Sequence, residues 1–199
     1  PVGVADQITV SEAATATTLT GGVTSVLAND SDSDGDPITA VLLTNPSYGT
    51  LVLNTNGTFS YAHNGSETTS DTFTYAANDG FINGNTVTVT IQISPVNDCP
   101  TVENPIADVN VQEDAPDSVI SIASVFEDID RVGGIPDNLS YSVTHTGAGI
   151  ATVTLNTTTI TINYIENQTG SFVVTVTVDD GAGCNTVNNA FSVTVNPQD

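Results

Sequence analysis

Strict alternation of apolar and polar residues is the feature that most restricts the fold of this chain. Residues 86–93 read Thr-Val-Thr-Val-Thr-Ile-Gln-Ile, so every second side chain is apolar. A period of two is typical of a strand with one buried face and one solvated face, and it differs from the 3.6-residue period of a helix. Helical periodicity is absent from the sequence. The chain is therefore predicted to be all-β.

Short alternating segments separated by turn residues recur through the first half of the chain. They predict strands at 6–13, 23–27, 37–44, 48–54, 57–62, 70–78 and 84–94. Asn56-Gly57 suits a tight hairpin turn, because glycine and asparagine tolerate a positive φ. The apolar residues on either side of this turn are expected to share one face: Leu51, Leu53, Phe59 and Tyr61.

The second half of the chain repeats the landmarks of the first half in the same order. Val10-Ser11-Glu12 recurs as Val111-Gln112-Glu113, about a hundred residues later. Asn78-Asp79-Gly80 recurs at a similar distance as Asp179-Asp180-Gly181. The order and spacing of these landmarks indicate an internal duplication.

The duplication predicts two domains, residues 1–97 and residues 98–199, each a seven-stranded Greek-key β-sandwich. In the second copy, residues 172–178 are apolar enough to lie in the middle of a sheet. Pro95 and Pro100 flank the joint, where they block sheet hydrogen bonding and stiffen the backbone. A short joint between two sandwiches is expected.

The charge of the chain is strongly one-sided. One basic residue, Arg131, stands against 23 acids, which gives a net charge of −22. Such a chain repels nucleic acid and anionic membrane, so neither is expected as a partner. The acids provide a solubility surface, or some of them cluster to bind cations; the count alone leaves both explanations open. The absence of lysine excludes intramolecular Lys–Asn cross-links.

The densest acidic run is Asp30, Asp32, Asp34 and Asp36. It matches the start of an EF-hand loop, but the twelfth position is Val41 and not the glutamate that an EF-hand requires. Four neighbouring carboxylates repel one another, and a bound divalent cation would offset that repulsion. Hard oxygen ligands suit Ca²⁺, whereas the alternative is a solvated loop.

The second copy has its acidic loop at Asp128 and Asp130, where Arg131 offers a competing ion-pair partner. The strand order places this loop and Asp180 at the end of the second domain nearest the joint. It places Glu12 and Glu67 at the facing end of the first. Six carboxylates are therefore expected to converge on the joint: Glu12, Glu67, Asp98, Asp128, Asp130 and Asp180.

The chain contains two cysteines, Cys99 and Cys184. They are either unrelated small core residues or a disulfide. The second interpretation follows from the strand order, because the start of a sandwich domain and its last hairpin turn lie at the same end. A bridge over so long a loop would stabilise the domain by roughly 4 kcal/mol in the loop-entropy model. It would also indicate an oxidising, extracellular compartment.

These residues resemble motifs of the cadherin superfamily, especially the cadherin-like and bacterial immunoglobulin-like repeats of large bacterial surface proteins. The first copy carries Leu27-Ala28-Asn29-Asp30 and Asn78-Asp79-Gly80 in the places of the bacterial repeat. The second is similar to the dystroglycan-type variant through residues 125–130 and Gln168-Thr169-Gly170. The chain departs from animal cadherins in having Cys99, where they continue the linker with asparagine.

The resemblance implies that Ca²⁺ binds between the domains. The ligands that it implies at the joint are Glu12, Glu67, Asn97, Asp98, Asp128, Asp130 and Asp180. Further metal ligands are expected in the acidic loops of the first copy: Asp30, Asp32, Asp34, Asp36 and Asp79.

Motifs for catalysis are absent, and His63 and His145 stand apart from any catalytic pattern. We expect a non-catalytic, Ca²⁺-stiffened spacer or adhesion module of a secreted or surface-anchored bacterial protein. Neighbouring repeats, and a cell-surface protein or polysaccharide, are the expected partners. Because the sequence starts at Pro1 without Met, we expect a piece of a longer protein. The alternative is a carbohydrate-binding β-sandwich, which exposed tyrosines would favour.

Overall fold

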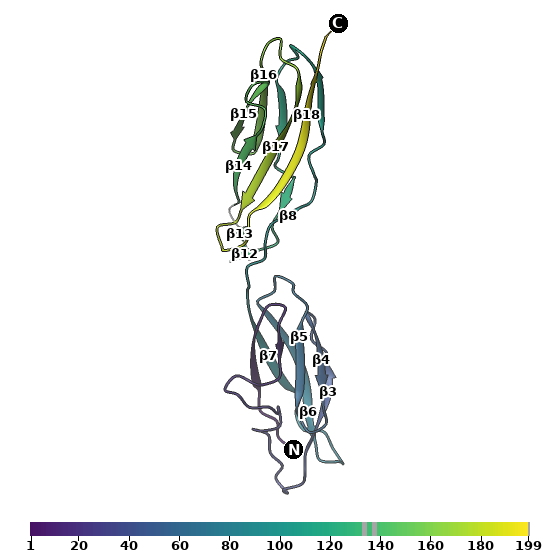
Figure 1. Cartoon of the computed structure of the whole chain (residues 1–199). Helices are drawn as coiled ribbons and strands as arrows, with labels where there is room; N and C mark the ends of the chain where they lie inside the picture. The colour runs from purple at the N-terminus through teal and green to yellow at the C-terminus, as the bar shows by residue number, and fades with distance from the viewer. Residues whose placement is uncertain (133–134, 137–138, 199) are drawn as a thin grey trace. The chain divides into compact units, whose positions relative to one another are not determined.

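The computed structural model describes residues 1–132, 135–136 and 139–198, in which every regular element is a strand (Figure 1). The chain divides into two compact units, Pro1–Val96 and Asn97–Asp199. The all-β prediction is confirmed. None of the described residues forms a helix long and apolar enough to span a membrane.

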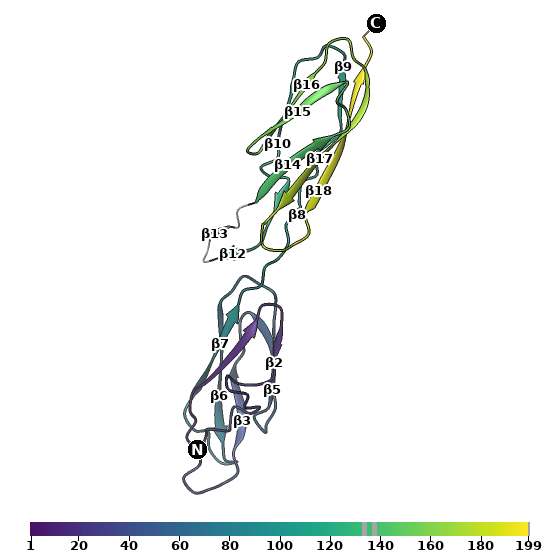
Figure 2. The ribbon, with the colours of Figure 1, turned by 60° about the vertical axis from the view of Figure 1, so that its left-hand side comes forward.

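The first unit is a two-layered sandwich (Figure 2). Its strands are β1 (Asp6–Ser11), β2 (Thr15–Ala16), β3 (Thr39–Thr44), β4 (Gly49–Leu53), β5 (Phe59–His63), β6 (Ser70–Asn78) and β7 (Val87–Ser94). One sheet has the order β1-β7-β6-β3 and the other the order β2-β5-β4. The pairing of β1 with β7 is parallel. The predicted seven-stranded sandwich is confirmed.

Alternation along the strands builds the core of this unit. Strand β7 buries alternate residues over its whole length, and Ile8 of β1 pairs with Ile91 of β7 on the buried face. In the hairpin of β4 and β5, Leu51 lies opposite Tyr61, and Gly57 takes the positive φ that its turn requires. Each fully buried aliphatic or aromatic side chain contributes roughly 1.5–3 kcal/mol. The predicted shared face of the hairpin is confirmed.

One predicted strand of the first unit is wrong. Residues 23–27 form turns with a single bridge from Ser25 to Thr58, and the short strand β2 pairs with β5 instead. The Ser25 hydroxyl donates to the Asn56 carbonyl and accepts from the Leu27 N–H. These side-chain hydrogen bonds compete with a regular ladder, so the segment stays irregular while its apolar side chain, Val26, remains buried.

The second unit repeats the sandwich. Its main strands are β9 (Val109–Gln112), β10 (Ser118–Ser121), β14 (Ser140–His145), β15 (Ala151–Asn156), β16 (Thr159–Tyr164), β17 (Gly170–Asp179) and β18 (Val187–Asn196). They form sheets of order β14-β17-β18-β9 and β10-β16-β15. Strand β9 is parallel to β18, as β1 is to β7. Strand β17 lies inside its sheet, as its apolar sequence predicts.

Two small ladders lie outside these sheets. One joins β8 (Thr101–Val102) to β11 (Phe126–Glu127), and the other joins β12 (Arg131–Val132) to β13 (Ile135–Pro136). The side chain of Arg131, considered above as an ion-pair partner, lies outside the described part of the structure.

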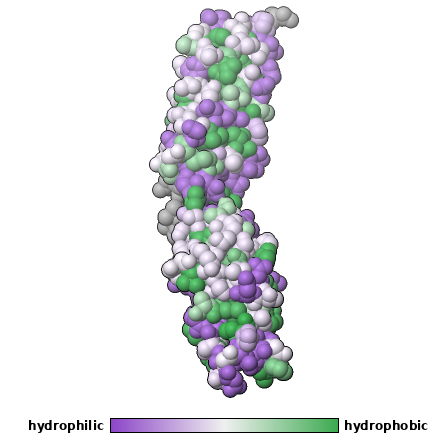
Figure 3. Space-filling model, turned by 60° about the horizontal axis from the view of Figure 1, so that its bottom comes forward, coloured by the Kyte–Doolittle hydropathy of each residue, from purple (hydrophilic) through white to green (hydrophobic). Residues whose placement is uncertain are grey.

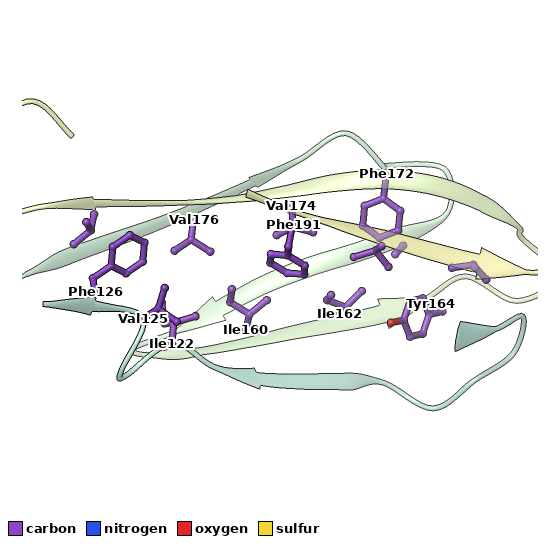
Figure 4. Close-up of a cluster of buried hydrophobic side chains, with 14 residues drawn as sticks. Ile122, Val125, Phe126, Ile160, Ile162, Tyr164, Phe172, Val174, Val176 and Phe191 are labelled. Atoms are coloured by element: carbon purple, nitrogen blue, oxygen red, sulfur yellow. The ribbon is translucent and has the colours of Figure 1, made fainter. Parts of the chain in front are cut away.

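Side chains of the two sheets meet in the core of the second unit (Figure 4). Ile160 and Ile162 project from β16 toward Val174 and Val176 of β17 and Phe191 of β18. All five are nearly or fully inaccessible to solvent. Each strand therefore contributes to the core only the side chains of the face that points toward the other sheet.

The buried carboxylate of Asp71 stabilises the turn at Ser47 and Tyr48 by hydrogen bonds. Asp71 of β6 is 6% exposed and accepts hydrogen bonds from the N–H groups of Ser47 and Tyr48 at 2.9 and 2.8 Å. It also accepts from the Tyr61 hydroxyl and the Thr72 N–H. Burial by itself raises the pKa of Asp71, but these four donors outweigh burial and hold the pKa below its ordinary value.

Replacing Asp71 with alanine is expected to lower the unfolding free energy by about 2–4 kcal/mol at neutral pH, because buried donors lose their acceptor. Since the pKa is lowered in the folded state, this stabilisation is present above pH 3.8 and is lost as the pH falls below it. Thermal unfolding over a pH series measures both effects. Asp36→Ala, at an exposed position, is the control; an equal loss in both variants contradicts the assignment.

Candidate metal-ligating residues

Glu12 lies at the point where the first unit ends. It follows β1, and its N–H donates to the Ser94 carbonyl at 2.9 Å, while its Oε2 accepts from the Val96 N–H at 3.3 Å. The residue is 7% exposed, and its Oε1 is buried without a hydrogen bond in the described structure. A buried carboxylate oxygen without a donor is costly unless a cation compensates it. The oxygen suits a hard metal ion.

Glu67 belongs to the same end of the first unit. It lies in the turn before β6, and one of its carboxylate oxygens is within 4.8 Å of one of Glu12. Two carboxylates at this separation repel each other in the absence of a cation. The pair offers oxygen ligands of the kind that Ca²⁺ prefers.

His63 holds the two turns that carry these acids. Its Nδ1 accepts from the N–H groups of Ala13 and Gly65 at 3.2 and 3.3 Å, and its Nε2 lies 3.0 Å from the Thr68 hydroxyl. An Nδ1 that accepts leaves the proton on Nε2, which then donates to Thr68. The sequence indicated only an ordinary strand-end residue, because nothing in it shows that residues 13 and 65 are neighbours.

The second unit gathers acids around its first residues. The Asp98 N–H donates to Asp130 Oδ2, and the Asp130 N–H donates to Asp128 Oδ1 at 3.1 Å. Asp130 is 4% exposed, and Oδ2 of Asp128 is buried without a hydrogen bond in the described structure. The sequence predicted this gathering, and these contacts lie entirely within one unit.

The turn after β17 completes the group. The Asn97 amide donates to Asp180 Oδ2 at 3.0 Å, and the Ala182 N–H donates to Asp180 Oδ1 at 2.9 Å. The hydrogen bond from Asn97, followed by that from Ala182, holds the pKa of Asp180 below its ordinary value. These hydrogen bonds favour the ionised form of Asp180, and its role as a metal ligand stays a prediction. Close by, Cys99 and Cys184 form a disulfide with a Cα–Cα distance of 5.5 Å.

The acids of the remaining loops of the first unit mostly stabilise their own turns. Asp32 Oδ1 accepts from the N–H groups of Asp34 and Asp36, and Asp79 Oδ1 accepts from those of Phe81 and Ile82. Considering the described residues of each unit separately, no three acidic, histidine or cysteine ligand atoms lie within 4.8 Å of one another. A metal role for the five aspartates of these loops stays a prediction.

Asp6 is a buried acid that the sequence analysis did not single out. It is 9% exposed, accepts from Asn29 at 3.1 Å and shares the hydroxyl of Tyr75 with Asp30. Burial raises the pKa of Asp6 to about 6, assisted by the neighbouring charge of Asp30. Its place at the start of a strand gave no sign of this, since the partners come from residues far along the chain.

Asp6→Asn is expected to stabilise the protein at pH 7 by on the order of 1–3 kcal/mol, because the neutral amide avoids the cost of a buried charge. The raised pKa means that wild-type stability falls as the pH rises from 3.8 to about 6. The gain should therefore vanish near pH 4. Melting curves at several pH values test this, with Asp117→Asn as the control, and a pH-independent gain contradicts it.

The described tyrosines do not form the exposed face that would favour a carbohydrate site. Tyr61, Tyr75 and Tyr164 are buried, and Tyr48 is 42% exposed. Figure 3 shows hydrophobic residues interspersed with hydrophilic ones on the visible face of each unit. The structure thus adds no support to the carbohydrate-binding alternative.

Comparison with known families assigns each unit. Residues 1–95 match the family model described as "Bacterial cadherin-like domain". Residues 99–196 match the one described as "Putative Ig domain". The first unit thus matches a cadherin-like family model and the second an Ig-like one. The predicted resemblance is confirmed, while the dystroglycan-type assignment of the second domain stays a prediction. No curated protein sequence matches the chain.

Solved cadherin structures share this fold. Human protocadherin-24 EC1-2 (form II) aligns with a TM-score of 0.64 at 16% identity, covering 100% of this chain and 99% of that one. Mouse cadherin-23 EC22-24 aligns with a TM-score of 0.61 at 21% identity, covering 98% and 63%. Drosophila N-cadherin EC1-4 aligns with a TM-score of 0.59 at 18% identity, covering 98% and 48%. At these identities the likeness establishes the fold of the tandem domains.

Proposed function

We propose that this tandem is a non-catalytic spacer or adhesion module, stiffened by Ca²⁺ bound where its two domains join. The observation that carries the proposal is the buried, unpartnered Oε1 of Glu12 beside the last residues of the first domain. Ca²⁺ is the fitting cation, because all the groups in question offer hard oxygen ligands.

Among the described residues, each domain by itself gathers too few ligand atoms for a Ca²⁺ site, which supports a site to which both domains contribute. The first domain offers Glu12 and Glu67, and the second offers Asn97, Asp98 and three further aspartates. Neither domain by itself brings three such ligand atoms together among its described residues. Ca²⁺ takes six to eight oxygens, and ligands contributed by both domains would help to supply that number. A site of this kind couples the orientation of the domains to the ion.

The charge of the chain gives the mechanism. Without a cation, carboxylates near the joint repel; at ~5 Å and an effective dielectric constant of ~20, each pair costs on the order of 3 kcal/mol before screening. Shared coordination replaces this repulsion with attraction, so the joint loses conformational freedom. The net charge of −22 adds to this repulsion when no cation is bound.

The setting that fits this function is extracellular. Cadherin-like domains are extracellular modules, and a disulfide persists in an oxidising compartment. Neighbouring repeats of the same chain are the immediate partners. A surface protein or polysaccharide is the external partner that an adhesion module would meet. A bacterial secreted or surface-anchored protein agrees with the family of the first domain.

Calcium is expected to raise the melting temperature of the chain and to restrict motion between its domains. Glu12→Gln should abolish most of the shift, because it removes the charge that the ion compensates. Calorimetry and small-angle scattering, each with calcium and with chelator, measure the two effects. Calcium-binding affinity is expected to fall at least about tenfold, or 1.4 kcal/mol.

Glu103→Gln provides the matched control, since it changes the same charge at an exposed residue outside the predicted ligand set. It should respond to calcium as the wild-type chain does. Identical melting and scattering of the wild-type chain with and without calcium would exclude the proposed function.

A further inference from the structure

The segment that carries Asn97 and Asp98 has no strand to hold it. Residues 95–100 adopt no regular structure, and β8 begins only at Thr101. Both ligand residues are exposed. An exposed, irregular segment samples many backbone conformations, so something outside the sheets must keep its oxygens in place.

The disulfide is attached directly to this segment. Cys99 follows Asp98, and its partner Cys184 lies in the turn that begins with Asp180. The Cys184 sulfur also lies 3.4 Å from the Asp98 carbonyl and 3.2 Å from the Asn97 amide nitrogen. The covalent bridge therefore ties the segment bearing two ligands to the turn bearing a third.

Hydrogen bonds complete this arrangement. The Asn97 amide donates to Asp180, and the Asp98 N–H donates to Asp130. The Asn97–Asp180 contact is exposed and the Asp98–Asp130 contact is partly buried, and a hydrogen bond to a charged group contributes about 1.5–3 kcal/mol. The disulfide is the one covalent constraint on the segment besides the chain itself.

We propose that the Cys99–Cys184 disulfide is the positioning element for Asn97, Asp98 and Asp180, and that its reduction weakens Ca²⁺ binding. The inference rests on the proposed function and deepens it by adding redox control of the same site. Cys99 thereby ties the linker to the turn that carries Asp180.

The bridge is open to reducing agents. Cys99 is exposed and Cys184 is half-buried. An external dithiol attacks one sulfur as a thiolate, forms a mixed disulfide and closes to its own disulfide. The two protein sulfurs leave as thiols, so two electrons and two protons pass from the dithiol to the protein. The redox conditions around the protein thereby determine whether the Cys99–Cys184 disulfide is intact or reduced.

The expected rise in the Kd for calcium depends on the fraction of time that residues 95–100 spend in the conformation that binds the ion. If release of the tether leaves the segment in its binding conformation about a tenth of the time, the apparent Kd for calcium rises about tenfold. A role confined to stability predicts a lower melting temperature with an unchanged Kd at temperatures where the domain is folded.

The experiment measures calcium binding to the whole chain by titration calorimetry, before and after a non-metal-binding phosphine reductant, and in Cys99→Ser/Cys184→Ser. We expect about a tenfold rise in Kd in both cases, with circular dichroism confirming the fold. Ile162→Val is the matched control, because it loosens the core of the same domain far from the segment. Its Kd should equal that of the wild-type chain.

A second variant covers failure of the serine variant to fold. A glycine inserted between Asp98 and Cys99 keeps the disulfide but slackens the tether, and it should also raise the Kd about tenfold. Equal calcium affinity of oxidised, reduced and inserted chains overturns the positioning role and leaves the proposed function intact. Absence of calcium binding to the oxidised wild-type chain overturns both.

Discussion

Parallel pairing of the first and last strands is the interaction on which both domains depend. In the first domain β1 runs beside β7 from Asp6 to Ser11, and in the second β9 runs beside β18. Because the paired strands point the same way, the residue after the first strand must lie beside the end of the domain. Glu12 reaches Val96 for this reason, and Glu113 contacts Gln198 in the same manner. A purely antiparallel closure would place these glutamates at the opposite end.

Apolar residues are buried along the strands, whereas most of the acidic residues discussed above lie in the turns. Along β7 the buried positions are Val or Ile, and the solvent-facing ones are uncharged, as at Thr88 and Thr90. Most of the acids that matter here lie in the turns, where side-chain carboxylates accept hydrogen bonds from nearby backbone N–H groups. These carboxylates therefore do not disturb strand pairing, because they lie in turns and not along the strands.

The exceptions are the acids that the fold buries. Burial raises the pKa of both acids; at Asp71 four donors outweigh burial and lower the pKa, whereas Asp6 has fewer donors and a neighbouring acid, so its pKa rises. Identical side chains in one domain thus have pKa values shifted in opposite directions for a local reason. The sequence did not reveal either pKa shift. Two donors to Asp71 come from a turn more than twenty residues away, and the partners of Asp6 are also distant in sequence.

Alternation by itself determined that this chain is all-β and that Leu51 and Tyr61 share a face. These are local properties, since the period of two follows from backbone geometry. Local pattern failed at residues 23–27, where side-chain hydrogen bonds outweigh propensity. Only the tertiary structure decided how His63 joins two turns and how Asp6 shares a proton donor with Asp30. Each of these depends on groups distant in sequence, whose approach is set by the packing of whole sheets.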